Sequence, residues 1–156
     1  MRTWAPVGQT PLLPEALRYE HLSAISAITP QGQLYLMTKE QSLKAADVIV
    51  FLQHLLEAVP GKLLLFWDRG TIHRAIVTKE FLLRHADQIE VEWLPAYAPE
   101  LNPDEGVWRY LKQVELRNLS CPDIAAVRRA VVQAAQRLRG RPRIIKSFFR
   151  LASLIL

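Results

Sequence analysis

Apolar and polar residues alternate loosely over two early segments, 21–28 and 33–38, and both are rich in strand-forming residue types. The turn sequence Thr29-Pro30-Gln31-Gly32 lies between them, with a proline that presets φ and a glycine that tolerates positive φ. The pattern therefore predicts a β-hairpin. Residues 1–20 hold three prolines and a glycine, so we expect them to be extended and irregular.

A change to helical spacing marks residues 42–58, where apolar side chains recur every three or four positions. Ser42 is a candidate N-cap for this helix, and Pro60-Gly61 follows as a stop signal. The next run, 62–67, is almost wholly apolar, which predicts a strand covered on both faces.

The rest of the pattern predicts further helices and one more strand. They are a helix over 71–86, a strand over 89–94, a turn over 95–99, a helix from Asn102 to about Arg117, and a last helical region that opens at Pro122 and is interrupted at Gly140 and Pro142. The order is a hairpin followed by β-α-β alternation and further helices, which is typical of the α/β class. We expect one domain, with a main body over 1–120 and a helical extension over 121–156.

Charge is distributed unevenly along the 156 residues, whose net charge is +5. Eight of the 20 Lys and Arg residues and no Asp or Glu lie after Asp123: Arg128, Arg129, Arg137, Arg139, Arg141, Arg143, Lys146 and Arg150. Acidic residues outnumber basic ones in the remainder. A basic helical ending favours nucleic acid or another anionic surface as partner, and a solvated helix face without a partner is the alternative.

Composition also narrows the class of protein. Cys121 is the single cysteine, which excludes an internal disulfide and a zinc site built from several cysteines. The first residues lack the apolar run of a signal peptide, and no stretch reaches the roughly 18 apolar residues of a membrane span. We therefore expect a cytoplasmic setting and no membrane partner.

Asp68 is the first candidate for chemistry because it directly follows the apolar run 62–67. Ligands of open α/β sheets bind at the carboxyl ends of the strands, where an acid after a buried strand is well placed. The alternative is an aspartate that forms a turn or caps a helix before Arg69-Gly70.

Glu105 is the second candidate. Asn102 suits an N-cap, Pro103 suits the first helical position and Glu105 occupies the third, so a capping box is the simpler interpretation. A capping box does not account for the whole unusual run from Pro95 to Trp108.

That run carries a family resemblance. Tyr97-Ala98-Pro99-Glu100-Leu101-Asn102-Pro103-Asp104-Glu105, followed by Trp108 and Leu111-Lys112, closely resembles the third-carboxylate motif of DDE transposases of the mariner superfamily, in its bacterial insertion-sequence branch. The segment from Phe66 to His73 is similar to the sequence around that family's second carboxylate, Asp68 here. The resemblance covers about residues 3–120.

The resemblance implies a fold, an activity and partners. The fold would be a ribonuclease H-like mixed sheet flanked by helices, with the catalytic domain over 1–120 and its basic helical extension over 121–156. Asp68 and Glu105 would hold Mg²⁺ or Mn²⁺, two ions in the complete enzyme, for DNA strand cleavage and strand transfer in cut-and-paste transposition of an insertion sequence. Transposon ends and target DNA would be the substrates, and the active complex would be a homodimer.

The chain departs from the family at its first carboxylate. In the family this Asp ends a first, central strand upstream of a linker that Thr3-Trp4-Ala5-Pro6 resembles, and no Asp precedes Asp47 here. We therefore expect a sheet without its first central strand, two unpaired strand edges, weak metal binding and little or no cleavage by this chain alone. The missing strand would then come from an upstream reading frame or from another, upstream polypeptide.

Two other functions compete with a transposase. The first is a catalytically inactive, DNA-binding remnant of such an enzyme. The second is an unrelated α/β enzyme for small molecules that uses Asp68, which the lack of a Gly-rich phosphate loop and the run from Tyr97 to Lys112 both oppose.

Further residues are candidates for auxiliary roles. His73 matches a family histidine and would either touch the scissile phosphate or pack locally, while Trp108 is expected in the core. The candidate DNA contacts are Arg109, Lys112, Arg137, Arg139, Arg141 and Arg143. Such contacts to phosphate would be independent of sequence and sensitive to salt, and solvated or flexible surface is the alternative.

Overall fold

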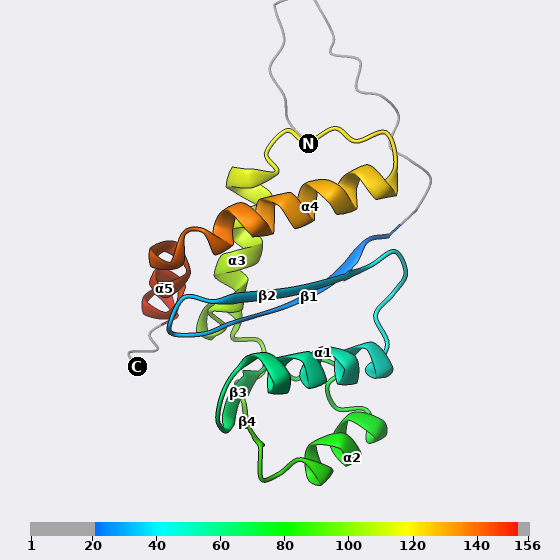
Figure 1. Ribbon diagram of the computed structural model, residues 1–156, viewed down its shortest axis with the longest axis vertical. Coiled ribbons are helices and arrows are strands. Elements are labelled where there is room, and N and C mark those ends of the chain that lie inside the picture. Colours follow the sequence, from blue (N-terminus) through cyan, green and yellow to red (C-terminus); the bar gives the residue numbers. More distant parts are fainter. Residues whose placement is uncertain (1–20, 153–156) are drawn as a thin grey trace, which may run out of the picture.

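The computed structural model describes residues 21–152, and their elements follow the predicted order (Figure 1). The strands are β1 (Ser23–Ile28), β2 (Leu34–Lys39), β3 (Leu63–Trp67) and β4 (Ile89–Trp93), and the helices are α1 (Ala45–Ala58), α2 (Ile76–Arg84), α3 (Asp104–Tyr110), α4 (Ile124–Arg139) and α5 (Pro142–Leu151). A 3₁₀ turn, Pro99–Leu101, precedes α3, and a π-helical turn, Leu111–Glu115, follows it. The α/β class is confirmed. The irregular chain predicted for residues 1–20 lies outside the described residues.

The hairpin predicted from the Pro-Gly turn is confirmed. β1 and β2 pair antiparallel from Ser23 opposite Lys39 to Ile28 opposite Leu34. Gly32 takes a φ of 91°, which an L side chain rarely adopts, and a Cβ there would lie 2.7 Å from the Cβ of Pro142. The glycine therefore allows both the turn and the close approach of α5.

The second pair of strands, β3 and β4, is parallel and is joined by α2. The alternation predicted for β4 is confirmed, with Ile89 buried and Glu90 exposed. The prediction that both faces of β3 are covered is wrong, because Leu64 is 54% exposed. An apolar run is compatible with a strand in the middle of a sheet, but β3 has a strand partner on one side only among residues 21–152.

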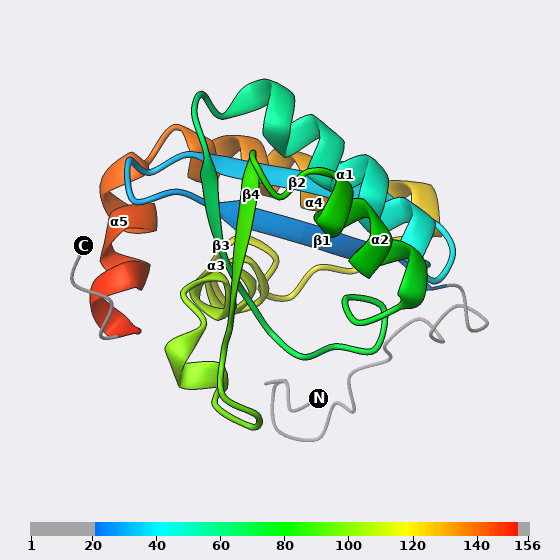
Figure 2. The same cartoon turned by 90° about the horizontal axis from the view of Figure 1, so that it is seen from below.

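The described strands form two separate two-stranded sheets, β1–β2 and β3–β4. Seen from below, β3 and β4 run across the hairpin at a steep angle instead of lying beside it (Figure 2). Within residues 21–152, each of the four strands, β1 and β3 included, therefore has one edge without a strand partner.

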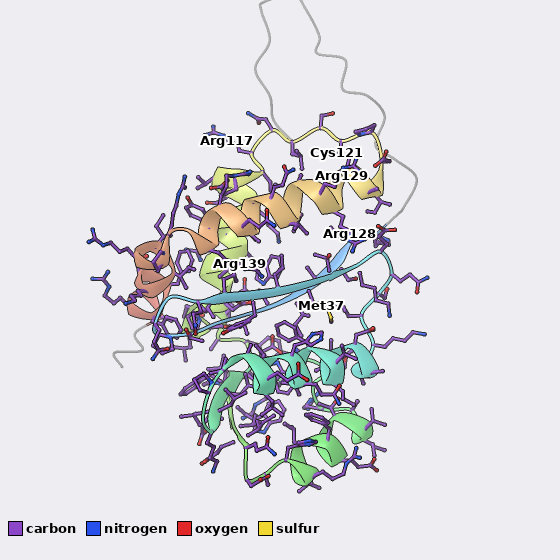
Figure 3. All side chains as sticks on the ribbon, viewed as in Figure 1. Met37, Arg117, Cys121, Arg128, Arg129 and Arg139 are labelled. Carbon is purple, nitrogen blue, oxygen red and sulfur yellow. The ribbon has the colours of Figure 1, made fainter. Side chains whose placement is uncertain are left out.

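The hairpin lies between two hydrophobic cores because side chains alternate between the two faces of a strand. Tyr35 and Met37 pack against the core of α1, α2 and β4, and Figure 3 shows Met37 on the side of the hairpin that faces α1. Leu34 belongs to the core on the opposite face, and Leu36 packs against that core. The first core holds Val48, Phe51, Leu52, Leu55, Phe81 and Ile89. The second joins β2, α3, α4 and α5 through Leu34, Val107, Leu111, Ala134, Ala135, Leu138, Ile145 and Phe148.

Two predicted helix starts are wrong for local reasons. α1 begins at Ala45 with Lys44 as its N-cap, because the Asp47 carboxylate accepts the Lys44 backbone N–H at 2.7 Å. Ser42 is therefore not the cap. α4 begins at Ile124 and not at Pro122, since Asp123 caps it by accepting the Ala126 N–H at 2.6 Å.

The predicted helix over 71–86 is shorter in the structure, and its first residues form turns. His73 and Arg74 donate their backbone N–H groups to the Gly70 carbonyl, and regular helix begins only at Ile76. The break predicted between the last two helices is confirmed at Gly140 and Pro142. In the described part of the chain, no helix combines the length and apolar character needed to cross a membrane.

Candidate active site

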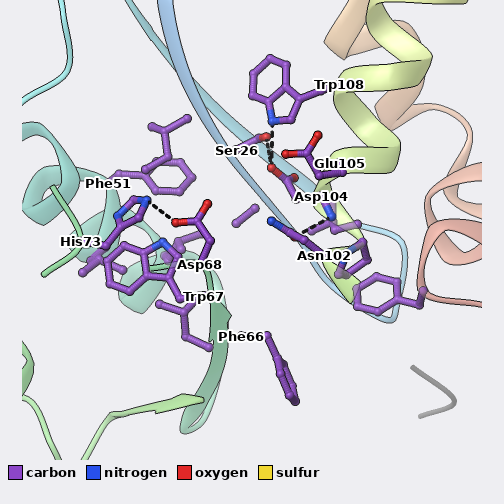
Figure 4. A pocket seen from close by; sticks show the side chains of 18 of the residues that line it. Ser26, Phe51, Phe66, Trp67, Asp68, His73, Asn102, Asp104, Glu105 and Trp108 are labelled. Atoms are coloured by element: carbon purple, nitrogen blue, oxygen red, sulfur yellow. Dashed lines mark hydrogen bonds and ion pairs between the residues drawn. The ribbon is translucent and has the colours of Figure 1, made fainter. Parts of the chain in front are cut away.

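A cavity of about 370 Å³ separates the two sheets. Its walls include five consecutive residues of β1, Ala24 to Ile28, and the consecutive run from Leu64 to Asp68 on β3. Phe51, Leu52 and Leu55 of α1 also contribute, and the start of α3 brings Asp104 and Glu105. Asp68 and the α3 carboxylates thus face the same cavity from different elements (Figure 4).

Asp68 follows the last residue of β3, and its side chain is 57% exposed. Its Oδ1 accepts the Gly70 N–H at 2.9 Å, so the turn expected as the alternative does form. Because that turn uses Oδ1, the second carboxylate oxygen stays free of hydrogen bonds within residues 21–152. The local turn fixes the side chain and leaves an oxygen for a ligand.

His73 lies directly beside Asp68, with its Nε2 3.4 Å from the Asp68 Oδ1 and its ring centroid 4.1 Å from that of Trp67. Burial lowers the pKa of His73 below its usual 6.5, and the charge of Asp68 opposes this effect in part. The imidazole is therefore largely neutral at neutral pH. In this form it can fix the position of Asp68 without removing the negative charge of the carboxylate.

Glu105 occupies the first turn of α3, and its residue is exposed. The capping-box interpretation is wrong, because the Asn102 N–H donates to the Pro99 carbonyl at 3.0 Å and not to Glu105. Asn102 itself caps the helix through its Oδ1, which accepts the Asp104 N–H at 3.1 Å. No hydrogen bond or ion pair involves the Glu105 carboxylate in the described part of the chain.

Asp104 is a site residue that the sequence analysis missed. Its Oδ2 accepts hydrogen bonds from the Ser26 hydroxyl at 2.7 Å and from the Trp108 Nε1 at 3.1 Å, while its buried Oδ1 has no partner within the described residues. Burial raises the pKa of Asp104 to about 6, against the two hydrogen bonds, and the charges of Glu105 and Asp68 raise it further. All three carboxylates therefore interact electrostatically.

The oxygen donors of this cavity fit a hard divalent cation. Mg²⁺ prefers oxygen ligands, keeps several of its waters and is commonly bound by only one or two carboxylates. Asp68 and Glu105 offer accessible carboxylate oxygens, and Asp104, whose buried Oδ1 has no hydrogen-bond partner within residues 21–152, lines the same cavity. Within residues 21–152, no set of three or more His, Cys, Asp or Glu side chains is arranged to hold one ion. The fit is thus to two carboxylates with water in the remaining positions.

Of the other candidate residues, one packs against a hydrophobic core and two lie on the surface. Trp108 packs against the core of α3–α5, as predicted, and its indole N–H bonds Asp104. Arg109 and Lys112 are exposed on the helical segment that begins at Asp104. Whether they contact DNA stays a prediction.

The arginine cluster around the α4–α5 break is largely engaged inside the protein. Arg137 Nε and Arg141 Nη1 pair with Glu115 at 2.6 and 3.3 Å, and Arg141 also donates to the Tyr110 hydroxyl at 2.6 Å. Arg139 Nε donates to the Leu34 carbonyl at 2.9 Å, and Arg143 is exposed. The first three side chains thus have structural partners, which the sequence did not reveal, and their predicted role in DNA binding is untested.

Comparison with known proteins bears on the same residues. A family model described as DDE superfamily endonuclease matches residues 1–128, a range that includes both cavity walls and all three carboxylates. A search of curated proteins found no match.

Proposed function

The chain belongs to the DDE superfamily of endonucleases, and from this premise we propose that it is the catalytic domain of a transposase that cuts and joins DNA strands. The finer assignment is the bacterial insertion-sequence branch of the mariner superfamily, with cut-and-paste transposition as the reaction. The observation that carries the proposal is that Asp68 and Glu105, from separate elements, line one cavity with oxygen atoms free for ligands.

The proposed chemistry depends on the negative charge of the Asp68 and Glu105 carboxylates. Two divalent ions, when bound, would lower the pKa of an attacking water and stabilise the departing oxygen. Asp68 and Glu105 would hold Mg²⁺ or Mn²⁺ through their free oxygens. A neutral His73 beside Asp68 leaves the negative charge of that carboxylate available to the cation.

Asp104 acts in this proposal as a positioning residue for Glu105. Its Oδ2 joins Ser26 of β1 to Trp108 of α3, so the first turn of α3 is fixed against the hairpin. A carboxylate held on a rigid element needs little rearrangement when it binds a cation or when charge develops during the reaction.

The sequence-based prediction of an upstream polypeptide that supplies a strand becomes part of this proposal. Side chains of a strand alternate between its faces, so a cavity lined by consecutive residues runs along the strand's edge. The cavity between β1 and β3 meets this condition on both walls. We therefore place one intervening strand between β1 and β3. A carboxylate at its end would then complete the site.

DNA is the substrate class that the family implies, and the homodimer of the active complex is part of the proposal. The inactive DNA-binding remnant is the second candidate. It is favoured by one observation, that no three candidate metal ligands converge on a single point within residues 21–152.

The experiment begins with the DNA immediately upstream of the Met1 codon, translated in all three frames. A frame that encodes an apolar strand ending in Asp is expressed together with this chain, and metal-dependent nicking of DNA is measured. We expect nicking by the pair, at most residual nicking by the chain alone, and loss of nicking in Asp68→Asn and Glu105→Gln.

Matched controls separate this outcome from loss of fold. Asp87→Asn and Glu57→Gln make the same chemical changes at exposed residues outside the cavity and are expected to leave nicking unchanged. Nicking that persists in both site variants contradicts the proposal. If no frame encodes such a strand and DNA binding persists without nicking in every protein, the remnant is the correct function.

A further inference from the structure

A second cavity, of about 540 Å³, is also lined by the two catalytic candidates. It shares Asp68, Asn102 and Glu105 with the first cavity, and its other walls are Arg69-Gly70, Arg74 and the loop from Leu94 to Pro99. Its volume lies in the range of small-ligand pockets, about 300–1,000 Å³. A molecule bound there would lie against the proposed cleavage site.

The loop that walls this cavity is fixed at both ends. The Leu94 N–H donates to the Trp67 carbonyl at 2.8 Å, and Arg69 Nε donates to the Leu94 carbonyl at 3.1 Å. Pro99 begins the 3₁₀ turn, where Leu101 N–H donates to the Ala98 carbonyl. The conformation between these anchors is therefore a defined feature of the fold.

Tyr97 is the unusual residue of this loop. Its φ is 58°, in the left-handed region where a bulky side chain is strained, and the residue is 102% exposed. A fully exposed ring contributes no burial to the fold that would offset the strain. Strained backbone that the surroundings impose is concentrated at functional sites, so a ring displayed in this way suggests a ligand.

The positive charge in the same cavity as Tyr97 indicates the class of ligand. Arg69 and Arg74 line the same cavity and are exposed, and no ion pair of Arg74 is found within residues 21–152. An exposed aromatic ring next to a guanidinium is the combination with which proteins bind unpaired nucleotides, by stacking on the base and pairing with the phosphate. Bases inside a duplex are already stacked on both faces, so the ring fits a base that has left the stack.

We propose that this second cavity binds one unpaired nucleotide adjacent to the phosphate that is cut, with Tyr97 stacked on its base and Arg74 paired with its phosphate. The proposal rests on the proposed function, because it takes DNA as the substrate. It adds a specific binding site for an unstacked nucleotide, so a terminal or frayed end is preferred over continuous duplex. Stacking tolerates every base, so the site reads the unpaired state more than the sequence.

The test uses the full chain with a short single-stranded oligonucleotide that carries 2-aminopurine, whose fluorescence is quenched on stacking. We expect Tyr97→Ala to weaken binding about tenfold or more and to remove the quenching, while Tyr97→Phe preserves both. Arg74→Ala should weaken binding and reduce the salt dependence by about one phosphate contact. Leu83→Ala and Arg84→Ala, both at exposed positions of α2, are the matched controls and should bind as the unmodified chain does.

Tyr97→Gly keeps the test decisive if the alanine variant folds poorly. Glycine accepts positive φ, so this variant is expected to be at least as stable as the unmodified chain and still to lose binding and quenching. Quenching and affinity unchanged in Tyr97→Ala overturn the inference, and so does a Tyr97 effect confined to association between protein chains. Failure of the proposed function is a separate result, seen as divalent-cation binding that does not depend on Asp68 or Glu105.

Discussion

The helical segment from Asp104 to Glu115 carries acidic residues at both ends, and the protein surrounds them differently. Glu115 is 8% exposed and is paired with Arg137 and Arg141. Glu105 is exposed, Asp104 has a buried oxygen without a partner, and no ion pair from the described chain neutralises either residue. The protein itself supplies counter-charges to Glu115, whereas the described residues supply none to the carboxylates that we propose face a bound cation.

The π-helical turn contributes to this difference. Leu116 N–H donates to the Leu111 carbonyl, five residues back, which shifts the helix register just before Glu115. Glu115 then faces α4 and the α4–α5 break, where its arginine partners lie. At the other end, Glu105 faces both cavities next to Asp68.

The largest expected effect concerns Asp104, at the end without counter-charge. Its pKa in the folded protein is about 6, above the ordinary 3.8, so the protonated form favours the folded state. This contribution is complete below pH 3.8 and is lost as the pH rises through about 6. Its size is about 3 kcal/mol, from roughly 1.4 kcal/mol for each pH unit between the two pKa values.

Urea unfolding between pH 4 and 7, with chelator present, measures this effect. We expect the unfolding free energy of the unmodified chain to fall relative to that of Asp104→Asn over this interval. If the unfolding free energies of the two proteins changed in parallel with pH, folding would not raise the pKa of Asp104.

The next effect concerns Glu115, at the end with counter-charges. Glu115→Gln removes the charge that two arginines share, and breaking a buried ion pair costs about 3–5 kcal/mol. Because Arg137 and Arg141 are about half exposed, solvent screens these pairs, and we expect a loss of unfolding free energy below that range, about 2 kcal/mol. Cation binding at Asp68 and Glu105 should not change. A variant as stable as the unmodified chain would show that the pairs are only a surface feature.

The smallest expected effect is on the loop beside the site. Tyr97→Gly removes a strained backbone conformation and should raise the unfolding free energy by roughly 1 kcal/mol, measured by urea unfolding at neutral pH. Tyr97→Ala is the control: alanine is also strained at positive φ, so this variant should not show the rise in unfolding free energy. A lower stability of the glycine variant would mean that the tyrosine ring contributes contacts to the fold.

Local sequence signals predicted much of the fold. The turn at residues 29–32 set the hairpin, and the alternation over 89–93 set β4, because both depend on neighbouring residues alone. The predicted start of α1 was wrong because the Asp47 carboxylate, which also accepts two hydrogen bonds from Lys39, accepts the Lys44 backbone N–H and so makes Lys44 the N-cap. The exposure of β3 depends on which strands pair with it, which an apolar run does not encode.

In the candidate site, too, short motifs could be recognised in the sequence, whereas contacts between distant segments could not. Asp68 and Glu105 were predicted as site residues from short motifs, and the structure shows that both line one cavity; their role in catalysis stays a prediction. Asp104 was missed because its burial depends on Ser26, 78 positions away in the chain. Trp108 at i+4 was the only sequence signal that a hydrogen bond to Asp104 was within reach. The arginine contacts with Glu115 also join distant segments, and the π-helical turn that makes them possible has no clear sequence signature.

The most direct test of the contrast between the two ends is Mn²⁺ binding by the chain itself, followed by the electron paramagnetic resonance signal of free Mn²⁺. The account predicts weak but saturable binding that Asp68→Asn and Glu105→Gln each reduce at least tenfold, and that Glu115→Gln leaves unchanged. Binding that is equally strong in all four proteins, or lost only with Glu115→Gln, would contradict the assignment of Asp68 and Glu105 as the cation site.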